Sequence, residues 1–487
     1  MNSTASLSEN NKSLAIILAS TLMAIFFGLL SMTANFIAIS MVVAFFAGVI
    51  LLSHPTLIVW IVLSVSLLVL GFTTLYDGSE KAGWGISILG FVLMLLAFFK
   101  VATVPSMRKD TPAFIWLLLG FFIFGEINSL VHWYSAEEFF GSFKRYFQMW
   151  GLLFALCWLA FDEQYIRRWR MFFLIVAVAQ LPCAIYELIV LVPQREGMRG
   201  LLSGMVPIDA VAGTFGTSIY GGGRSGDMAT FLIIVLAFLL VRGMQKVLPV
   251  KWLTLLIAGV LAPLFIGETK IVIIMLPVML IVLYRRELLA RPHYGLMALA
   301  VGGLLTVCMG YAYLNIMHTS LEKLFADTLR YNLYEQGYGE NHLNRTTALT
   351  FWVDNQGAHD PVSFMFGNGL GSSHLPTGGH VNRSYPNYGI GLTSASTLLW
   401  DTGVFGCSLI IAVFIMAWRT AGRLCRESTD PMVRADAAAI QASLWLFFIH
   451  IFYSGSLLDS PGFQIVFVAV LGYLAWLHRR WRVGSRP

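Results

Sequence analysis

Long apolar runs recur along the whole chain, separated by short polar segments. A helix of about 20 apolar residues crosses a bilayer core of about 30 Å, so each run is read as a membrane span. Backbone groups in lipid must be paired within the segment, which predicts helices, and the alternating pattern of a membrane barrel does not occur in the sequence. The predicted spans are residues 14–30, 33–53, 56–76, 83–100, 113–131, 146–161, 171–193, 227–243, 252–266, 271–284, 294–316, 391–418, 437–457 and 463–478.

Composition supports a membrane protein. Of the 487 residues, 57% are hydrophobic and 12% are charged, about half the charged share of an ordinary soluble domain. This excludes a soluble enzyme, a disordered chain and a disulfide scaffold, and the five cysteines have no CxxC or metal-ligand spacing. We therefore predict an all-α polytopic membrane protein of about 14 transmembrane helices (12 to 14), with one large outer loop that contains short helices.

The charged residues predict the orientation of these spans. With the N-terminus inside and the sides alternating at each span, about two thirds of the 32 Lys and Arg residues fall in the short inner segments. Acidic residues are distributed in the opposite sense. Both termini are then cytoplasmic, and the protein is expected in a bacterial inner membrane. The basic clusters between apolar runs are typical of membrane topology and predict no nucleic-acid partner.

One segment has two interpretations. Residues 252–284 form either one long tilted helix or a hairpin of two short helices. A hairpin places both flanking basic loops, 242–251 and 285–291, at the inner face, whereas a single helix would place them on opposite sides. We therefore predict two helices. Each is short for the membrane core, which places the tip, with Glu268 and Lys270, below the outer surface. Ionisable residues at that depth predict a functional site, and an interfacial pair that reaches the surface is the alternative.

The spans divide the chain into three parts. Residues 1–317 hold helices 1 to 11 and a loop at 194–226, the Gly/Arg loop, which is rich in glycine and arginine. Residues 318–390 form the large loop, predicted to be periplasmic, and residues 391–487 hold helices 12 to 14 and a basic cytoplasmic tail.

The large loop is rich in aromatic residues, which argues against disorder. Its pattern predicts amphipathic helices around 320–336 and 343–355, followed by a Gly-rich turn region. Loops of this length without regular structure are uncommon unless they are functional or disordered. The chemistry is therefore expected on the outer face.

Four acidic residues fall in the outer halves of predicted spans. They are Glu126, Glu187, Glu268 and Asp401. This polarity predicts a cavity that opens outward, rather than a channel. Glutamates that reach the membrane interface are the alternative interpretation, and for Glu187 we prefer it.

Three motifs follow one another near the C-terminal end. Arg345 stands seven residues before Trp352, a GNGLG turn occupies 367–371, and WDTGVFG at 400–406 opens a helix. Earlier, a Gly-rich stretch at 213–227 precedes a mid-chain span. Together, and in this order, the motifs resemble the O-antigen polymerase and O-antigen ligase superfamily, the Wzy-like and WaaL-like enzymes of bacterial surface polysaccharide synthesis. GNGLG is not interpreted as a dinucleotide fingerprint, because no βαβ unit surrounds it.

The resemblance implies a substrate and a reaction. The donor would be an oligosaccharide on undecaprenyl pyrophosphate, whose reducing end moves to an acceptor sugar hydroxyl at the outer face. No nucleotide cofactor is implied, and because arginines can carry the charge, no metal is required. Membrane lipid and other polysaccharide assembly proteins are the further expected partners.

Such a reaction needs fixed cations for the pyrophosphate that leaves. Arginine is suited to phosphate because its planar fork donates to two oxygens. A structural ion pair of Arg345 with Glu340 or Asp354 is the alternative for that residue. The candidates are Arg345 first, then Arg224 and Arg199, with Lys270 as a point charge.

The attacking hydroxyl needs a base within hydrogen-bond reach. His380, His374 and Glu268 are the candidates. Ligase-type relatives carry a histidine about eleven residues before the glycine that matches Gly403, whereas this chain has Leu-Thr-Ser at 392–394. The missing histidine favours a polymerase over a ligase, and both stay open beside a transporter of lipid-linked saccharide and a non-catalytic assembly scaffold.

Overall fold

The structure is a computed structural model that describes residues 51–73, 82–198, 207–220, 222–246, 249–267, 269–290, 292–316 and 341–484, with a few isolated positions elsewhere. The chain divides into two compact units, Met1–Ile58 and Val59–Pro487. The first is almost wholly outside the described residues, as are the predicted spans at 14–30 and most of 33–53.

The described part of the chain is helical, and its only β pairing is an isolated bridge between Thr217 and Gly223. The elements up to the Gly/Arg loop are α3 (Pro55–Ser64), η1 (Val65–Val69), α4 (Leu70–Thr73), α5 (Ala82–Thr103), α6 (Pro105–Lys109), α7 (Ala113–Val131), α8 (Ala136–Phe147), α9 (Trp150–Trp158), α10 (Glu163–Tyr186), η3 (Glu187–Leu191) and α11 (Val192–Gly197). The Gly/Arg loop contains the short helices η4 (Pro207–Ala210) and η5 (Gly213–Phe215). Four long helices follow it: α12 (Ser225–Met244), α13 (Val250–Ile266), α14 (Val272–Ala290) and α15 (Pro292–Ile316). The last are α17 (Thr347–Gln356), α18 (Pro361–Phe366), η6 (Leu375–Thr377), α19 (His380–Ser384), α20 (Ser394–Glu427), α21 (Pro431–Tyr453), α22 (Ser456–Asp459) and α23 (Pro461–Gly484).

Eight helices in the described residues are long and apolar enough to cross a membrane. Their positions agree with eight of the predicted spans. They are Pro55–Thr73, Gly83–Thr103, Ala113–Val131, Glu163–Gly197, Ser225–Met244, Ser394–Glu427, Pro431–Tyr453 and Pro461–Val483. Three shorter apolar helices, Val250–Ile266, Val272–Arg285 and Gly295–Leu304, match three more. The prediction of several membrane-length helices is confirmed, while the total of fourteen stays a prediction.

The predicted hairpin at 252–284 is confirmed as two helices, α13 and α14. The predicted span at 146–161 is not one continuous helix, because α8 ends at Phe147 and, after a break at Gln148 and Met149, the wholly buried α9 follows with nine residues. Only α9 is uniformly apolar, which is why hydropathy alone predicted a span there.

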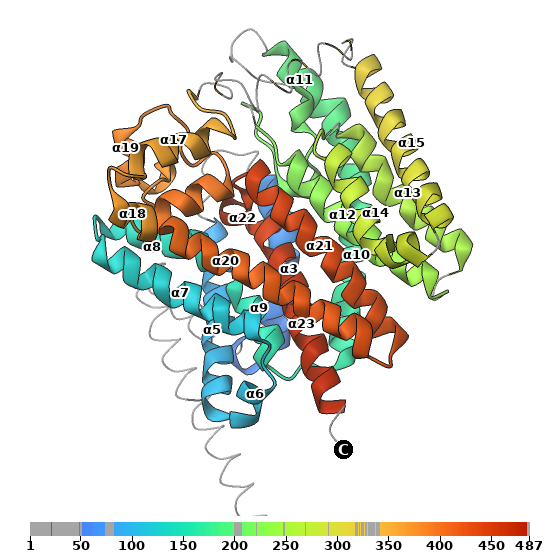
Figure 1. Ribbon diagram of the computed structural model, residues 1–487, viewed down its shortest axis with the longest axis horizontal. Coiled ribbons are helices and arrows are strands. Elements are labelled where there is room, and N and C mark those ends of the chain that lie inside the picture. Colours follow the sequence, from blue (N-terminus) through green and yellow to red (C-terminus); the bar gives the residue numbers. More distant parts are fainter. Residues whose placement is uncertain are drawn as a thin grey trace, which may run out of the picture. The chain divides into compact units, whose positions relative to one another are not determined.

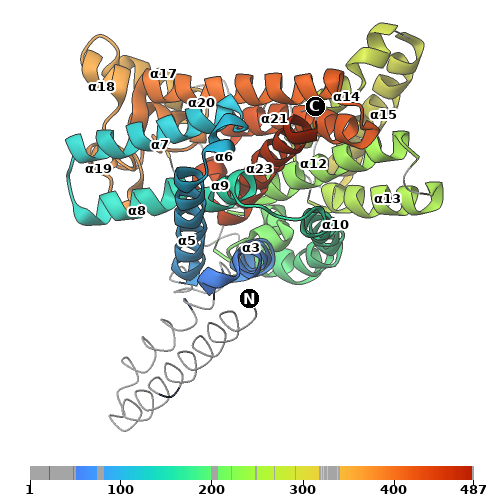
Figure 2. The same cartoon turned by 90° about the horizontal axis from the view of Figure 1, so that it is seen from below.

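The long helices pack through small residues. Helix α9 lies between α5 and α23, and a Cβ on Gly151 would come within 1.7 Å of the Gly90 carbonyl oxygen of α5. Such close backbone approach is typical of membrane helix interfaces. Helix α21 packs against α20, α12 and α14, and α20 also packs against α7, as both views show (Figures 1 and 2).

The described part of the large loop folds onto the end of α20. Its core contains Leu343, Trp352, Ile390 and Trp400, all buried, and Trp352 stacks on Phe364 with ring centroids 4.6 Å apart. Helices α17, α18 and α19 gather here beside α7 and α8 (Figures 1 and 2). Helix α17 confirms the helix predicted near 343–355, while the helix predicted at 320–336 lies outside the continuously described residues.

Candidate functional site

Helix α8 carries a row of buried polar residues. Glu138, Ser142 and Arg145 stand four and then three positions apart, so they share one face of the helix. Ser135 caps the helix by accepting a hydrogen bond from the N–H of Glu138 at 3.1 Å. The polar face is covered by the large loop and by the short segment after α21.

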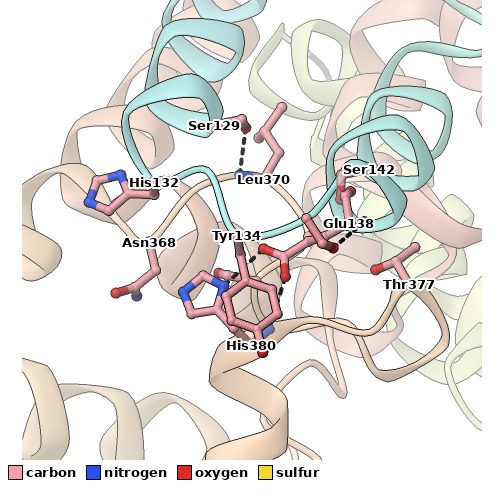
Figure 3. Close-up of polar contacts among 12 residues, drawn as sticks. Ser129, His132, Tyr134, Glu138, Ser142, Asn368, Leu370, Thr377 and His380 are labelled. Carbon is pink, nitrogen blue, oxygen red and sulfur yellow. Dashed lines mark hydrogen bonds and ion pairs between the residues drawn. The ribbon is translucent and has the colours of Figure 1, made fainter.

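Glu138 holds His380, the first residue of α19. One oxygen accepts the His380 backbone N–H at 3.0 Å, and the other lies 2.9 Å from Nδ1 of the ring. Figure 3 shows both oxygens turned toward His380, whose ring stacks on Tyr134 with centroids 5.3 Å apart. Nε2 makes no hydrogen bond to a described residue, and the side chain is 26% exposed. A carboxylate that fixes one ring nitrogen while the other faces outward is the arrangement of a general base.

Arg145 forms an ion pair with Asp459 of α22 through Nε. The arginine side chain is only 5% exposed, yet Nη1 and Nη2 have no hydrogen-bond partner among the described residues. His374 lies on the same carboxylate, with Nε2 3.6 Å from Oδ1 of Asp459. Buried donors without partners are costly, so these two enclosed donors are available to ligand oxygens that enter beside them.

Arg224 reaches the same segment from the Gly/Arg loop. It stands at the N-cap of α12, and its Nη1 donates to Oγ of Ser460, the residue after Asp459, at 3.2 Å. Burial raises the pKa of the Asp459 carboxyl, but Arg145, with smaller effects from His374 and Arg224, outweighs burial and leaves the pKa below its ordinary value. Two arginines and a histidine therefore converge on one carboxylate.

Arg345 and Lys270 approach a second carboxylate, that of Asp209 in η4. Burial raises the pKa of Asp209, and the cations Arg195, Lys270 and Arg345 oppose this shift. Arg345 also donates from Nε to the carbonyl oxygen of Tyr453 at 2.7 Å, and its guanidinium lies 4.6 Å from the centre of the Tyr453 ring. The C-terminal end of α21 therefore binds Arg345 through Tyr453, and the chain continues from there to Asp459 in α22.

The histidines differ in electrostatic setting. Burial, followed by the nearby Arg145 cation, lowers the pKa of His374 to about 4, so its imidazole is neutral at pH 7. His380 is paired with Glu138 instead. Seven residues separate Glu138 from Arg145, about 10 Å along the helix at 1.5 Å per residue. His380 and the Arg145 group therefore occupy the same face of α8 at neighbouring positions, without direct contact.

Asp401 is a structural residue. Its fully buried carboxylate accepts hydrogen bonds from Tyr146 Oη at 2.8 Å, Gly371 N at 2.7 Å, Ser372 Oγ at 3.0 Å and Ser373 N at 2.9 Å. The GNGLG turn and the WDTGVFG segment therefore pack on each other. Neither presents a phosphate-binding loop.

Glu187 was wrongly predicted to reach the membrane interface. It is 2% exposed, and one oxygen accepts the backbone N–H groups of Ala212 and Gly213 at 2.9 and 2.6 Å. The Gly/Arg loop is braced in a similar way by the buried Arg195, which donates from Nη2 to Thr217 Oγ1 at 2.7 Å. These two residues hold the loop that carries Arg224.

The predicted site residues have different outcomes. The structure brings Arg224, Lys270 and Arg345 to the same end of the helices, and it holds His380 on α8. Arg199 and Glu268 lie outside the described residues. Their predicted roles stay predictions.

Three residues of the site were missed from sequence: Glu138, Arg145 and Asp459. Glu138 and Arg145 lie in the short connection between the predicted spans 113–131 and 146–161. The signal was present in their spacing on one helical face, next to apolar positions. Asp459 has no local signal, because only folding brings it to Arg145.

Comparison with known proteins adds no relative: the chain matches no protein-family model, no curated protein and no solved structure.

Proposed function

We propose that the protein is a polysaccharide polymerase, which transfers a glycan from an undecaprenyl pyrophosphate carrier to an acceptor sugar at the outer face of a bacterial inner membrane. The observation that carries this proposal is Arg145. Its side chain is buried and oriented by Asp459, and its two Nη groups have no partner among the described residues. A guanidinium held in this way is prepared to bind two oxygens of one anion.

The surrounding cations support a pyrophosphate as that anion. Arg224 acts on Asp459, the partner of Arg145, while Lys270 and Arg345 act on Asp209, and the three cations come from separate segments. When the glycan leaves its carrier, negative charge develops on the pyrophosphate, and fixed cations in a partly buried site stabilise it more than water does. No nucleotide or metal enters this step.

The transfer is a displacement at the anomeric carbon of the donor. The acceptor hydroxyl oxygen forms a bond to this carbon, the bond from the carbon to the phosphate oxygen breaks, and undecaprenyl pyrophosphate leaves with the electron pair. The hydroxyl proton passes to Nε2 of His380, while Glu138 stabilises the imidazolium through Nδ1. The roughly 10 Å between the two parts of the α8 face accommodates the attacking hydroxyl, the anomeric carbon and the leaving phosphate in line between the base and the guanidinium.

The orientation is part of the proposal. Both termini are cytoplasmic, and the large loop and the Gly/Arg loop face the periplasm. The eight membrane-length helices support a protein that resides in the bilayer. Its partners are the lipid-linked oligosaccharide, membrane lipid and other polysaccharide assembly proteins.

The activity is tested with purified protein in detergent and a lipid-linked oligosaccharide, followed by product sizing. A ladder of products supports a polymerase. A single transfer to a different lipid acceptor would instead identify a ligase-type enzyme, and an unchanged substrate would favour a transporter of lipid-linked saccharide and contradict the proposal.

Variants test the anion site. Arg145→Gln and Arg345→Ala are expected to lower transfer by about 100-fold or more, because one charged hydrogen-bond donor to developing negative charge contributes about 3 kcal/mol. Arg345→Lys keeps the charge without the fork and should be intermediate. Lys144→Gln is the matched control, since its ammonium lies 4.7 Å from the Trp84 ring, away from Asp459. Equal transfer activity of Arg145→Gln and Lys144→Gln would contradict the assignment of Arg145 to the pyrophosphate-binding site.

A further inference from the structure

A cavity lies between three of the long helices, toward the end of α12 that carries Arg242. It has a volume of about 300 Å³ and is bounded by α10, α12 and α23. Its walls are apolar over most of their length, with side chains such as Phe173, Phe231, Ile234 and Val470. A cavity of this kind between membrane helices accepts hydrocarbon.

One end of the cavity is basic. Arg167 and Arg170 of α10 and Arg242 of α12 line it, together with Tyr473 of α23. These arginines belong to the clusters that the positive-inside rule assigns to the cytoplasmic face. This cavity, which we call the lipid groove, therefore runs from a charged end at the inner surface into the apolar interior of the helix bundle.

The arginines at this end outnumber the nearby carboxylates, which are Asp436 and Glu163, and Glu163 is already paired with Arg480 at 2.8 Å. The buried Asp436 accepts from Arg170 Nη1 at 3.0 Å and from Arg242 Nη2 at 2.9 Å, so one carboxylate serves two guanidinium groups. Tyr473 adds a neutral hydroxyl that donates to Asp436 at 2.5 Å. Arg167 is exposed at the rim and contributes a further positive charge.

Arg170 has spare donor capacity. Its Nη1 is used by Asp436 and by the Tyr473 hydroxyl at 2.6 Å, whereas its Nε is buried without a hydrogen-bond partner among the described residues. The side chain as a whole is 29% exposed, so an acceptor from outside the chain can reach the guanidinium at the basic end.

We propose that this groove is a binding site for an anionic glycerophospholipid of the cytoplasmic leaflet. The phosphate of the headgroup lies among Arg167, Arg170 and Arg242, and one acyl chain lies along α12 between α10 and α23. Basic pockets between membrane helices on the cytoplasmic side recognise anionic headgroups in this way. The site is separate from the Arg145 group, and lipid binding does not depend on the proposed transferase activity.

The test is lipid retention by the full chain in neutral detergent, measured by native mass spectrometry. Phosphatidylglycerol and phosphatidylcholine with identical acyl chains are offered at equal concentration, and phosphatidylglycerol is expected to be retained at least about fivefold more, as one well-placed basic residue provides. Arg167→Gln should remove most of this preference without disturbing the Asp436 network. Arg168→Gln is the matched control, because it is the next residue of α10, lies against Tyr165 and does not line the cavity.

Two further arms identify the ligand. Ala469→Phe fills the groove and should reduce phosphatidylglycerol retention, whereas glycerol phosphate, which has no acyl chain, should not displace the lipid. Equal retention of the two lipids, or equal losses in Arg167→Gln and Arg168→Gln, would overturn the proposal. Displacement by glycerol phosphate at equal concentration would also overturn it, in favour of a soluble phosphate ligand.

Discussion

The backbone N–H of Gly371 donates a hydrogen bond to Oδ2 of Asp401 across 2.7 Å. This bond joins the GNGLG turn of the large loop to the first turns of α20. The same carboxylate accepts from the Tyr146 hydroxyl of α8 at 2.8 Å. Asp401 is therefore the residue that holds together the large loop, α20 and α8, the helix that carries Glu138 and Arg145.

Asp401→Asn is expected to destabilise the protein by about 2 kcal/mol or more. The amide keeps one acceptor oxygen but turns an NH2 group toward a backbone N–H donor, which leaves a buried donor unpaired. Thermal unfolding in detergent measures the effect. Asp354→Asn, an exposed position of α17, is the control, and equal stability of the two variants would contradict the assigned role.

Gly403 and Gly120 are expected to respond oppositely to alanine. Gly403 has φ of +61° within α20, and a Cβ there would lie 2.5 Å from the backbone of Met365. Gly403→Ala should therefore cost at least about 2 kcal/mol of folding free energy. Gly120 lies in α7 with nothing within 4 Å of a Cβ, so Gly120→Ala should be neutral or stabilising by up to about 1 kcal/mol. Unfolding midpoints compare the two, and a harmless Gly403→Ala would show that the kink is not required.

His380 and Glu138 are expected to affect turnover more than substrate binding. His380→Ala should lower kcat about 100-fold or more, which is the usual contribution of a general base, and Glu138→Gln should lower it by a smaller factor. KM for the donor should change little, because the pyrophosphate contacts lie about 10 Å along α8. Glu137→Gln, exposed on the same helix, is the control. A rise in KM with unchanged kcat would assign His380 to binding instead.

Stability should fall as the pH drops from about 6.5 to 4. His374 is neutral in the folded protein, with a pKa of about 4 against 6.5 for the ordinary side chain, so the unfolded chain binds more protons in this window. The full effect is about 3 kcal/mol. His374→Gln should have a shallower loss of stability between pH 7 and 5 than the unchanged protein, measured by unfolding at both values. Parallel losses in the two proteins would show that His374 does not titrate with folding.

The apolar pattern predicted helix positions well because burial in lipid or in a helix bundle requires nearly continuous apolar side chains. Where that condition failed, so did the prediction. In α8, polar residues such as Glu138 and Arg145 are interspersed with apolar ones, so its mean hydropathy resembles that of a connecting segment. Its polar face is buried only because a loop that is distant in the sequence covers it. The hairpin of α13 and α14 was recovered because charge in the flanking loops supplied the missing information.

The sequence by itself determined the helical class of the protein and the positions of its long apolar helices. Both depend on local composition, whereas the cationic candidates Arg224, Lys270 and Arg345 depend on a resemblance between motifs. Only the tertiary structure decided that Arg145 and Asp459 pair, that Glu138 orients His380, and that Asp401 is structural. Those outcomes depend on contacts between residues far apart in the chain, and a local pattern does not encode which buried donor meets which acceptor.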